Sequence, residues 1–112
     1  MSIRDRLRAD LKTALKERDR VAASTIRTAL AAIENAEAVD AVEVDGTDPM
    51  GTVGLSRDVS RRALSPTDIR DILRREVDER QQAISTYETT EQHPEADRLR
   101  TELRVLERYV ED

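Results

Sequence analysis

Four basic side chains recur at intervals of four near the start of the chain: Arg4, Arg8, Lys12 and Lys16. In a helix this spacing places side chains along one face, so these residues form a basic strip, which Arg20 and Arg27 extend. Such a strip is suited to binding phosphates, with an affinity that falls steeply as salt rises. The alternative is a solvated face whose field is diluted by neighbouring acids. On charge alone, the solvated face is the favoured interpretation.

Arg27 and Asn35 are polar residues in an alanine-rich stretch. Eight residues separate them, which is about 80° around a helix. Arg27 directly follows Ile26, an expected core residue, so it should flank the core without entering it. Its guanidinium is then suited to holding a carboxylate of the second half of the chain, for example Glu76 or Glu102. A ligand-binding role for Arg27 stays open beside this structural one.

Residues for other kinds of chemistry are missing or scattered. The chain has no cysteine, which excludes thiolate catalysis and thiolate-bound metals. Its single histidine, His93, precedes Pro94 at an expected helix start, where capping or plain exposure is the favoured role. The three glycines do not form a phosphate-binding loop, and no pair of carboxylates is placed to converge. We therefore predict no catalytic residue, no metal site and no cofactor.

The composition favours one small helical domain spanning residues 1–112. Hydrophobic residues make up 38% of the chain, with two tyrosines and no phenylalanine or tryptophan, so the core must consist of Leu, Ile, Val and Ala. No aromatic platform is available for stacking bases. The net charge of −5 argues against a generally basic nucleic-acid binder, so contact with a polyanion would be local and near the N-terminus. Apolar runs are too short to cross a bilayer and no signal-peptide segment opens the chain, which predicts a cytoplasmic protein.

Apolar spacing predicts four helices, at about 3–17, 20–38, 66–89 and 94–111. Their starts carry capping signals at Ser2, at Asp19 and at Ser65-Pro66-Thr67-Asp68. Between the second and third helices, residues 39–64 are predicted to form a long acidic loop, with a turn of helix around 56–63. The expected fold is therefore an all-α bundle of two helical hairpins. The first helix is expected to bury one apolar face, which consists of Ile3, Leu7, Leu11, Ala14 and Leu15.

Taken together, these segments resemble the YqeY-like proteins of the GatB/YqeY domain family. The resemblance rests on Arg18-Asp-Arg, Ser-Thr-Ile-Arg27 and Ala-Ala-Ile-Glu-Asn-Ala-Glu37 in the first half. In the second half it rests on Leu64-Ser-Pro-Thr-Asp-Ile69, on Leu73 to Arg80, on Ile84 to Tyr87, and on Glu102-Leu103 with Leu106-Glu-Arg-Tyr-Val110. Two departures stand out. Glu91-Gln-His-Pro94 replaces the family's usual Gly-Arg turn, and the family's C-terminal helical domain is expected to be absent.

The resemblance implies a binding or accessory role linked to tRNA or to a tRNA-dependent amidotransferase subunit. The family's usual label is carbon–nitrogen ligase activity with glutamine as amido donor. That reaction needs a glutaminase nucleophile and an ATP-using centre, and neither pattern occurs in this sequence. The leading hypothesis is thus a non-catalytic module whose binding residues include Arg27, Asn35 and the basic strip. The alternatives are a ligase acting within an amidotransferase complex, and a structural module that forms homodimers through its helix faces.

Overall fold

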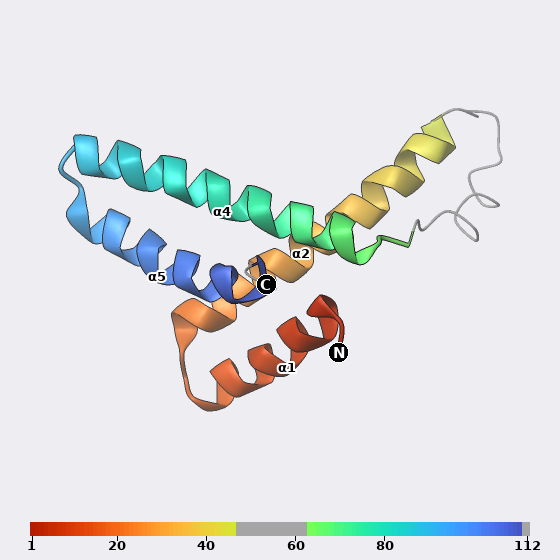
Figure 1. Ribbon diagram of the computed structural model, residues 1–112, viewed down its shortest axis with the longest axis horizontal. Coiled ribbons are helices and arrows are strands. Elements are labelled where there is room, and N and C mark those ends of the chain that lie inside the picture. Colours follow the sequence, from red (N-terminus) through yellow and green to blue (C-terminus); the bar gives the residue numbers. More distant parts are fainter. Residues whose placement is uncertain (47–62, 111–112) are drawn as a thin grey trace.

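The computed structural model describes residues 1–46 and 63–110, with side chains described for 1–38 and 63–110. Its helices are α1 (Ile3–Lys16), α2 (Arg20–Gly46), α4 (Pro66–Thr89) and α5 (His93–Val110). Helices α1 and α2 form one hairpin, α4 and α5 form the other, and the two hairpins pack together (Figure 1). The predicted all-α fold of two hairpins is confirmed. None of the described helices is long and apolar enough to cross a membrane.

The predicted caps start three of the helices. The Ser2 hydroxyl accepts a hydrogen bond from the Asp5 backbone amide at 3.1 Å, and Asp19 Oδ1 accepts one from the Ala22 amide at 3.1 Å. Ser65 and Asp68 form a reciprocal capping box with two bonds of 3.0 Å. These bonds satisfy backbone amides that have no partner within the helix. The helix boundaries at these places therefore follow from local chemistry.

The predicted end of the second helix at residue 38 is wrong. Helix α2 continues to Gly46 and takes in the first residues of the expected acidic loop. The reason is that 39–45 contain no glycine or proline, so nothing breaks the helical backbone bonding before Gly46. The glycines and the proline that favour a loop in this segment all lie at or after residue 46. Residues 47–62 of the predicted loop, and nearly all of the turn of helix expected at 56–63, lie outside the described residues.

Both hairpin turns use a residue with positive φ, and in neither case is it glycine: Arg18 has φ 57° and Glu91 has φ 59°. Asp19 donates its amide to the Ala14 carbonyl at 2.9 Å, and Gln92 donates to the Tyr87 carbonyl at 2.8 Å. At each turn a second amide donates three residues back at 3.2 Å, from Arg18 to Leu15 and from Glu91 to Glu88. The two bonds together form the Schellman arrangement, which closes a helix and reverses the chain. It explains how connections this short join antiparallel helices.

Glycine at position 91 is expected to stabilise the fold. The left-handed conformation costs a residue with a Cβ atom about 1 kcal/mol, and the exposed Glu91 side chain makes no interaction with other described residues. Glu91→Gly should therefore raise the free energy of unfolding by about 0.5–1 kcal/mol, measured by urea denaturation. Glu95→Gly, inside α5, is the control and should lower it by about 1 kcal/mol. Equal effects of the two changes would contradict this interpretation.

The core lies where the two hairpins meet. Its fully buried members come from all four helices and include Leu7, Ile26, Ile33, Leu73 and Leu106. Two departures concern the ends of helices. Leu15, expected in the core, is 48% exposed, whereas Tyr109 is completely buried. The physical reason is the crossing of the helices: only the part of α1 that faces α5 and α2 is covered.

Candidate functional site

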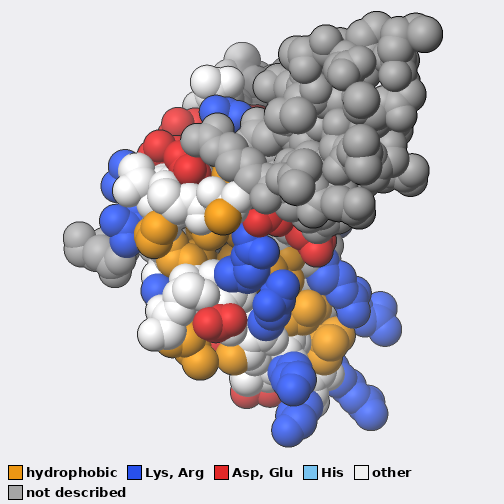
Figure 2. All heavy atoms as spheres, turned by 90° about the vertical axis from the view of Figure 1, so that its right-hand side faces the viewer, with side chains coloured by type: hydrophobic (Ala, Val, Ile, Leu, Met, Phe, Trp, Pro, Cys, Tyr) orange, Lys and Arg blue, Asp and Glu red, His pale blue; other side chains and the backbone are white. Residues whose placement is uncertain are grey.

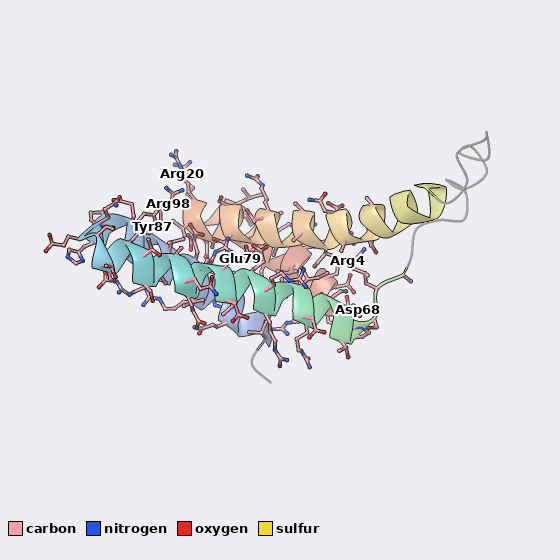
Figure 3. All side chains as sticks on the ribbon, turned by 90° about the horizontal axis from the view of Figure 1, so that it is seen from above. Arg4, Arg20, Asp68, Glu79, Tyr87 and Arg98 are labelled. Carbon is pink, nitrogen blue, oxygen red and sulfur yellow. The ribbon has the colours of Figure 1, made fainter. Side chains whose placement is uncertain are left out.

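The basic strip divides in two in the folded protein. Arg4 is half-buried and donates to the Glu37 carboxylate at 2.8 Å, which links the start of α1 to α2 (Figure 3). The other members are exposed and form no ion pair with another described residue: Arg8, Lys12, Lys16, Arg20 and Arg27. Arg4 therefore has a structural role, and the remaining five are available to a partner.

The surface near α1 is rich in cations. Figure 2 shows Lys and Arg side chains gathered on the lower half of the face that it presents, at the level at which α1 lies in Figure 1, with apolar side chains between them. The chain as a whole carries a net charge of −5. A basic surface on an acidic protein concentrates the attraction for an anionic partner at one place.

Arg27 does not hold a carboxylate of the second hairpin. The two expected partners, Glu76 and Glu102, instead bind Arg80: its Nη1 lies 2.9 Å from Glu76, and its Nε lies 3.0 Å from Glu102. Glu76 and Arg80 lie four residues apart on α4, the spacing at which oppositely charged side chains of a helix meet. Because α4 and α5 lie side by side, Arg80 reaches both acids within its own hairpin, and Arg27 is left on the surface of α2.

Asn35 is exposed and borders a shallow concavity between α2 and α4, of about 480 Å³. Ile72, Arg75 and Glu79 line it from the α4 side. Asn35 and Arg27 border different concavities, so the structure does not bring these two residues into one site.

A contact between the two ends of the chain was missed in the sequence. The Tyr109 hydroxyl donates a hydrogen bond to Asp10 Oδ2, and the Arg6 guanidinium lies 5.1 Å from the centre of the Tyr109 ring. Burial raises the pKa of Tyr109 well above its ordinary value, and the hydrogen bond and charge of Asp10 act in the same direction. A rare aromatic residue within a helical stripe was the available signal. It could not reveal a partner 99 positions away.

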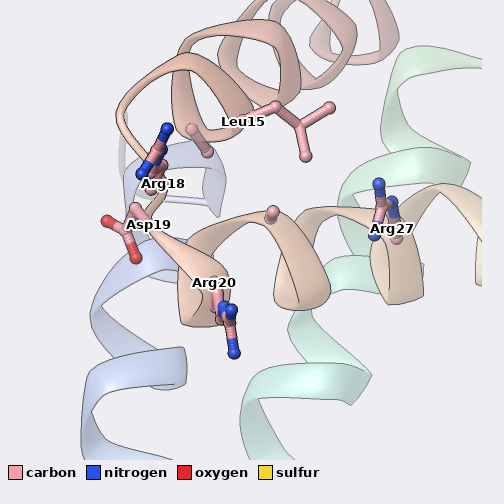
Figure 4. Close-up of a pocket in the computed structure, with 7 residues that line it drawn as sticks. Leu15, Arg18, Asp19, Arg20 and Arg27 are labelled. Carbon is pink, nitrogen blue, oxygen red and sulfur yellow. The ribbon is translucent and has the colours of Figure 1, made fainter.

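The turn between α1 and α2 carries the most distinctive concavity, of about 480 Å³. Its lining combines alanines and a leucine with three arginines and one acid: Ala14, Leu15, Arg18, Asp19, Arg20, Ala23 and Arg27. Figure 4 shows Leu15 extending from α1 over the space between the helices, with Arg18 and Asp19 at the turn and Arg27 farther along α2. Arg18, Arg20 and Arg27 thus border a floor that is formed by the apolar side chains of Ala14, Leu15 and Ala23.

Side chains suited to catalysis do not converge in the described part of the chain. His93 is exposed, and its Nδ1 lies 3.2 Å from Glu88 Oε1. This contact, followed by those of Arg100, lowers the pKa of Glu88. Among the side chains described, those of residues 1–38 and 63–110, no group of three or more His, Asp and Glu is placed to hold a metal ion.

The chain was compared with models of protein families, with curated proteins and with solved structures. No family model, curated protein or solved structure matches it.

Proposed function

We propose that this protein is a non-catalytic helical binding module of the GatB/YqeY type, cytoplasmic, which contacts tRNA through the basic face of α1 and the start of α2. The observation that carries the proposal is the set of five exposed cations without ion pairs to described residues: Arg8, Lys12, Lys16, Arg20 and Arg27. Phosphates of a folded RNA are the ligands that a row of separate cations on a helix fits best.

The non-catalytic part of the proposal rests on the state of the acidic residues. Glu76 and Glu102, two carboxylates that lie close together, both pair with Arg80. The Asp10 carboxylate accepts a hydrogen bond from the Tyr109 hydroxyl. Carboxylates held in this way serve as hydrogen-bond acceptors for the fold. The tRNA-dependent amidotransferase implied by the sequence resemblance would then supply the chemistry, with this chain as its accessory module.

Binding of tRNA should depend on salt in a way that reports the contacts. If four or five phosphates are neutralised, the logarithm of the association constant should fall against log salt with a slope of about −3 to −4. Reversing two charges, in Arg8→Glu/Lys12→Glu, should weaken binding at least about tenfold and reduce the slope by about two. Fluorescence anisotropy with labelled tRNA across a salt series measures both quantities.

The control carries the same change of charge at another place. Arg74 and Arg75 are exposed on α4, so Arg74→Glu/Arg75→Glu alters net charge equally and leaves α1 intact. It should bind tRNA within about threefold of the unaltered protein at moderate salt, where long-range effects are screened. No binding at low salt, or equal losses in both variants, would rule out this interface. Glutamine hydrolysis by the purified protein would favour the ligase alternative instead.

A further inference from the structure

The concavity at the α1–α2 turn has a floor that the proposed tRNA contact does not use. Ala14 and Ala23 are buried beneath it, and Leu15 is 48% exposed beside them. Apart from Met1, Leu15 is the one large apolar side chain exposed within the described residues. It lies in a hollow between two helices, where a side chain of another molecule can cover it.

The charges around this floor are unbalanced. Arg18, Arg20 and Arg27 border it, and none of them forms an ion pair with another described residue. The one acid of the lining, Asp19, is held by the backbone, because its Oδ1 accepts from the Ala22 amide. The concavity therefore presents three cations against one anion, together with an aliphatic surface, and its charge complement is a carboxylate-bearing segment with an apolar side chain.

We propose that this concavity binds an acidic segment of a partner protein. An aliphatic side chain of the segment covers Ala14, Leu15 and Ala23, and flanking carboxylates reach Arg18 and Arg27. RNA fits less well, since phosphates engage the arginines alone and leave Leu15 in water, and the floor has no aromatic ring on which a base can stack. The proposal goes beyond tRNA binding and does not depend on it: Arg20 and Arg27 belong to both surfaces, whereas Leu15 and Arg18 lie outside the basic strip and belong to this one alone.

The probe is a blocked, fluorescein-labelled peptide of three Glu-Glu-Leu-Ala repeats, titrated with the full chain. Two matched peptides replace every leucine by serine or every glutamate by glutamine. We expect the parent peptide to bind and each matched peptide to bind at least about fivefold more weakly. Amide NMR shifts on adding the parent peptide should concentrate at residues 14–27.

Variants of the protein test the apolar floor and the bordering arginines separately. Leu15→Gln keeps helix propensity and charge, and should weaken the peptide about fivefold while leaving tRNA affinity unchanged. Arg27→Gln should weaken the peptide about tenfold, whereas Arg74→Gln on α4 should have no effect. The double variant Arg8→Glu/Lys12→Glu should lose tRNA much more than peptide.

The proposal would be overturned by no binding of the parent peptide, by equal binding of the serine peptide, or by an unchanged peptide affinity in Leu15→Gln. Loss of tRNA affinity in Leu15→Gln would assign the floor to RNA instead and would equally overturn it. Failure of tRNA binding with intact peptide binding would reject the proposed function and leave this inference standing. The two proposals are therefore tested independently.

Discussion

Replacing Tyr109 with alanine is expected to lower the free energy of unfolding by about 3–5 kcal/mol, which is the usual cost of removing a fully buried aromatic ring. Tyr109 has no exposed surface, and it is the largest of the fully buried side chains. Its ring packs within the core cluster that the helices share, and Arg6 lies over it from α1. The free energy of unfolding of a domain of this size is about 5–15 kcal/mol, so the variant should be only marginally folded.

The hydroxyl can be tested separately from the ring. Tyr109→Phe keeps the ring and leaves the half-buried Asp10 carboxylate without its donor, which should cost about 1–3 kcal/mol. Urea denaturation followed by far-UV circular dichroism measures both variants. A loss below about 1 kcal/mol for Tyr109→Ala would show that α5 does not depend on this anchor.

Alkaline pH gives an independent test of the same contact. The pKa of Tyr109 is raised in the folded state by burial and by Asp10, so folding favours the protonated phenol. The stabilisation is fully present below the unfolded-state pKa of about 10 and declines as pH rises above it. The free energy of unfolding of the unaltered protein should therefore fall above about pH 10 more steeply than that of Tyr109→Phe. Parallel pH profiles would contradict the contact.

The second large effect is expected at Arg80. Its side chain is 13% exposed and lies between Glu76 and Glu102, which are 18% and 17% exposed. Burial by itself would lower the pKa of Arg80, but hydrogen bonds to the two acids outweigh this and raise it. Arg80→Met keeps the apolar stem and removes the charge, so two partly buried carboxylates are left facing each other. The expected loss is about 2–4 kcal/mol, near the cost of breaking a buried ion pair.

A compensating variant distinguishes lost charge pairing from lost packing. If the cost comes from unpaired carboxylates, then adding Glu76→Gln and Glu102→Gln to Arg80→Met should restore at least half of it. If it comes from the missing guanidinium contacts, the triple variant should be no more stable than the single one. Arg98→Met serves as the surface control, because Arg98 is 75% exposed and lies 3.6 Å from Glu102. It should cost less than about 1 kcal/mol.

Local features of the chain were readable in advance because their causes lie within a few residues. The cap at Ser65 with Asp68 and the pair between Glu76 and Arg80 each involve residues three or four apart on one helix. The apolar stripes also determined which face of each helix is buried. The end of α2 is the exception among local features, because the glycines and proline that favour a loop begin only at Gly46 and no residue in 39–45 interrupts the helix.

The candidate site was predicted only in part. Six of the seven expected binding residues on α1 and α2 lie exposed on the same hairpin, whereas Arg4 is held by Glu37. Of the six, Asn35 borders a different concavity from Arg27. Arg27 does not pair with Glu76 or Glu102, because Arg80 of α4 binds both of these carboxylates. A pattern along one helix predicts which face a residue occupies, but it does not say which residue of another helix lies opposite.

By itself, the sequence determined four helices, their caps, two antiparallel hairpins and a basic strip on the first. The tertiary structure alone decided which of the described charged side chains pair with one another. How the helices pack places Tyr109 on Asp10 between the two hairpins, Arg4 on Glu37 within the first, and Leu15 beyond the covered part of α1. The physical reason is range: helix spacing acts over three or four residues, whereas these contacts join residues 33 and 99 positions apart.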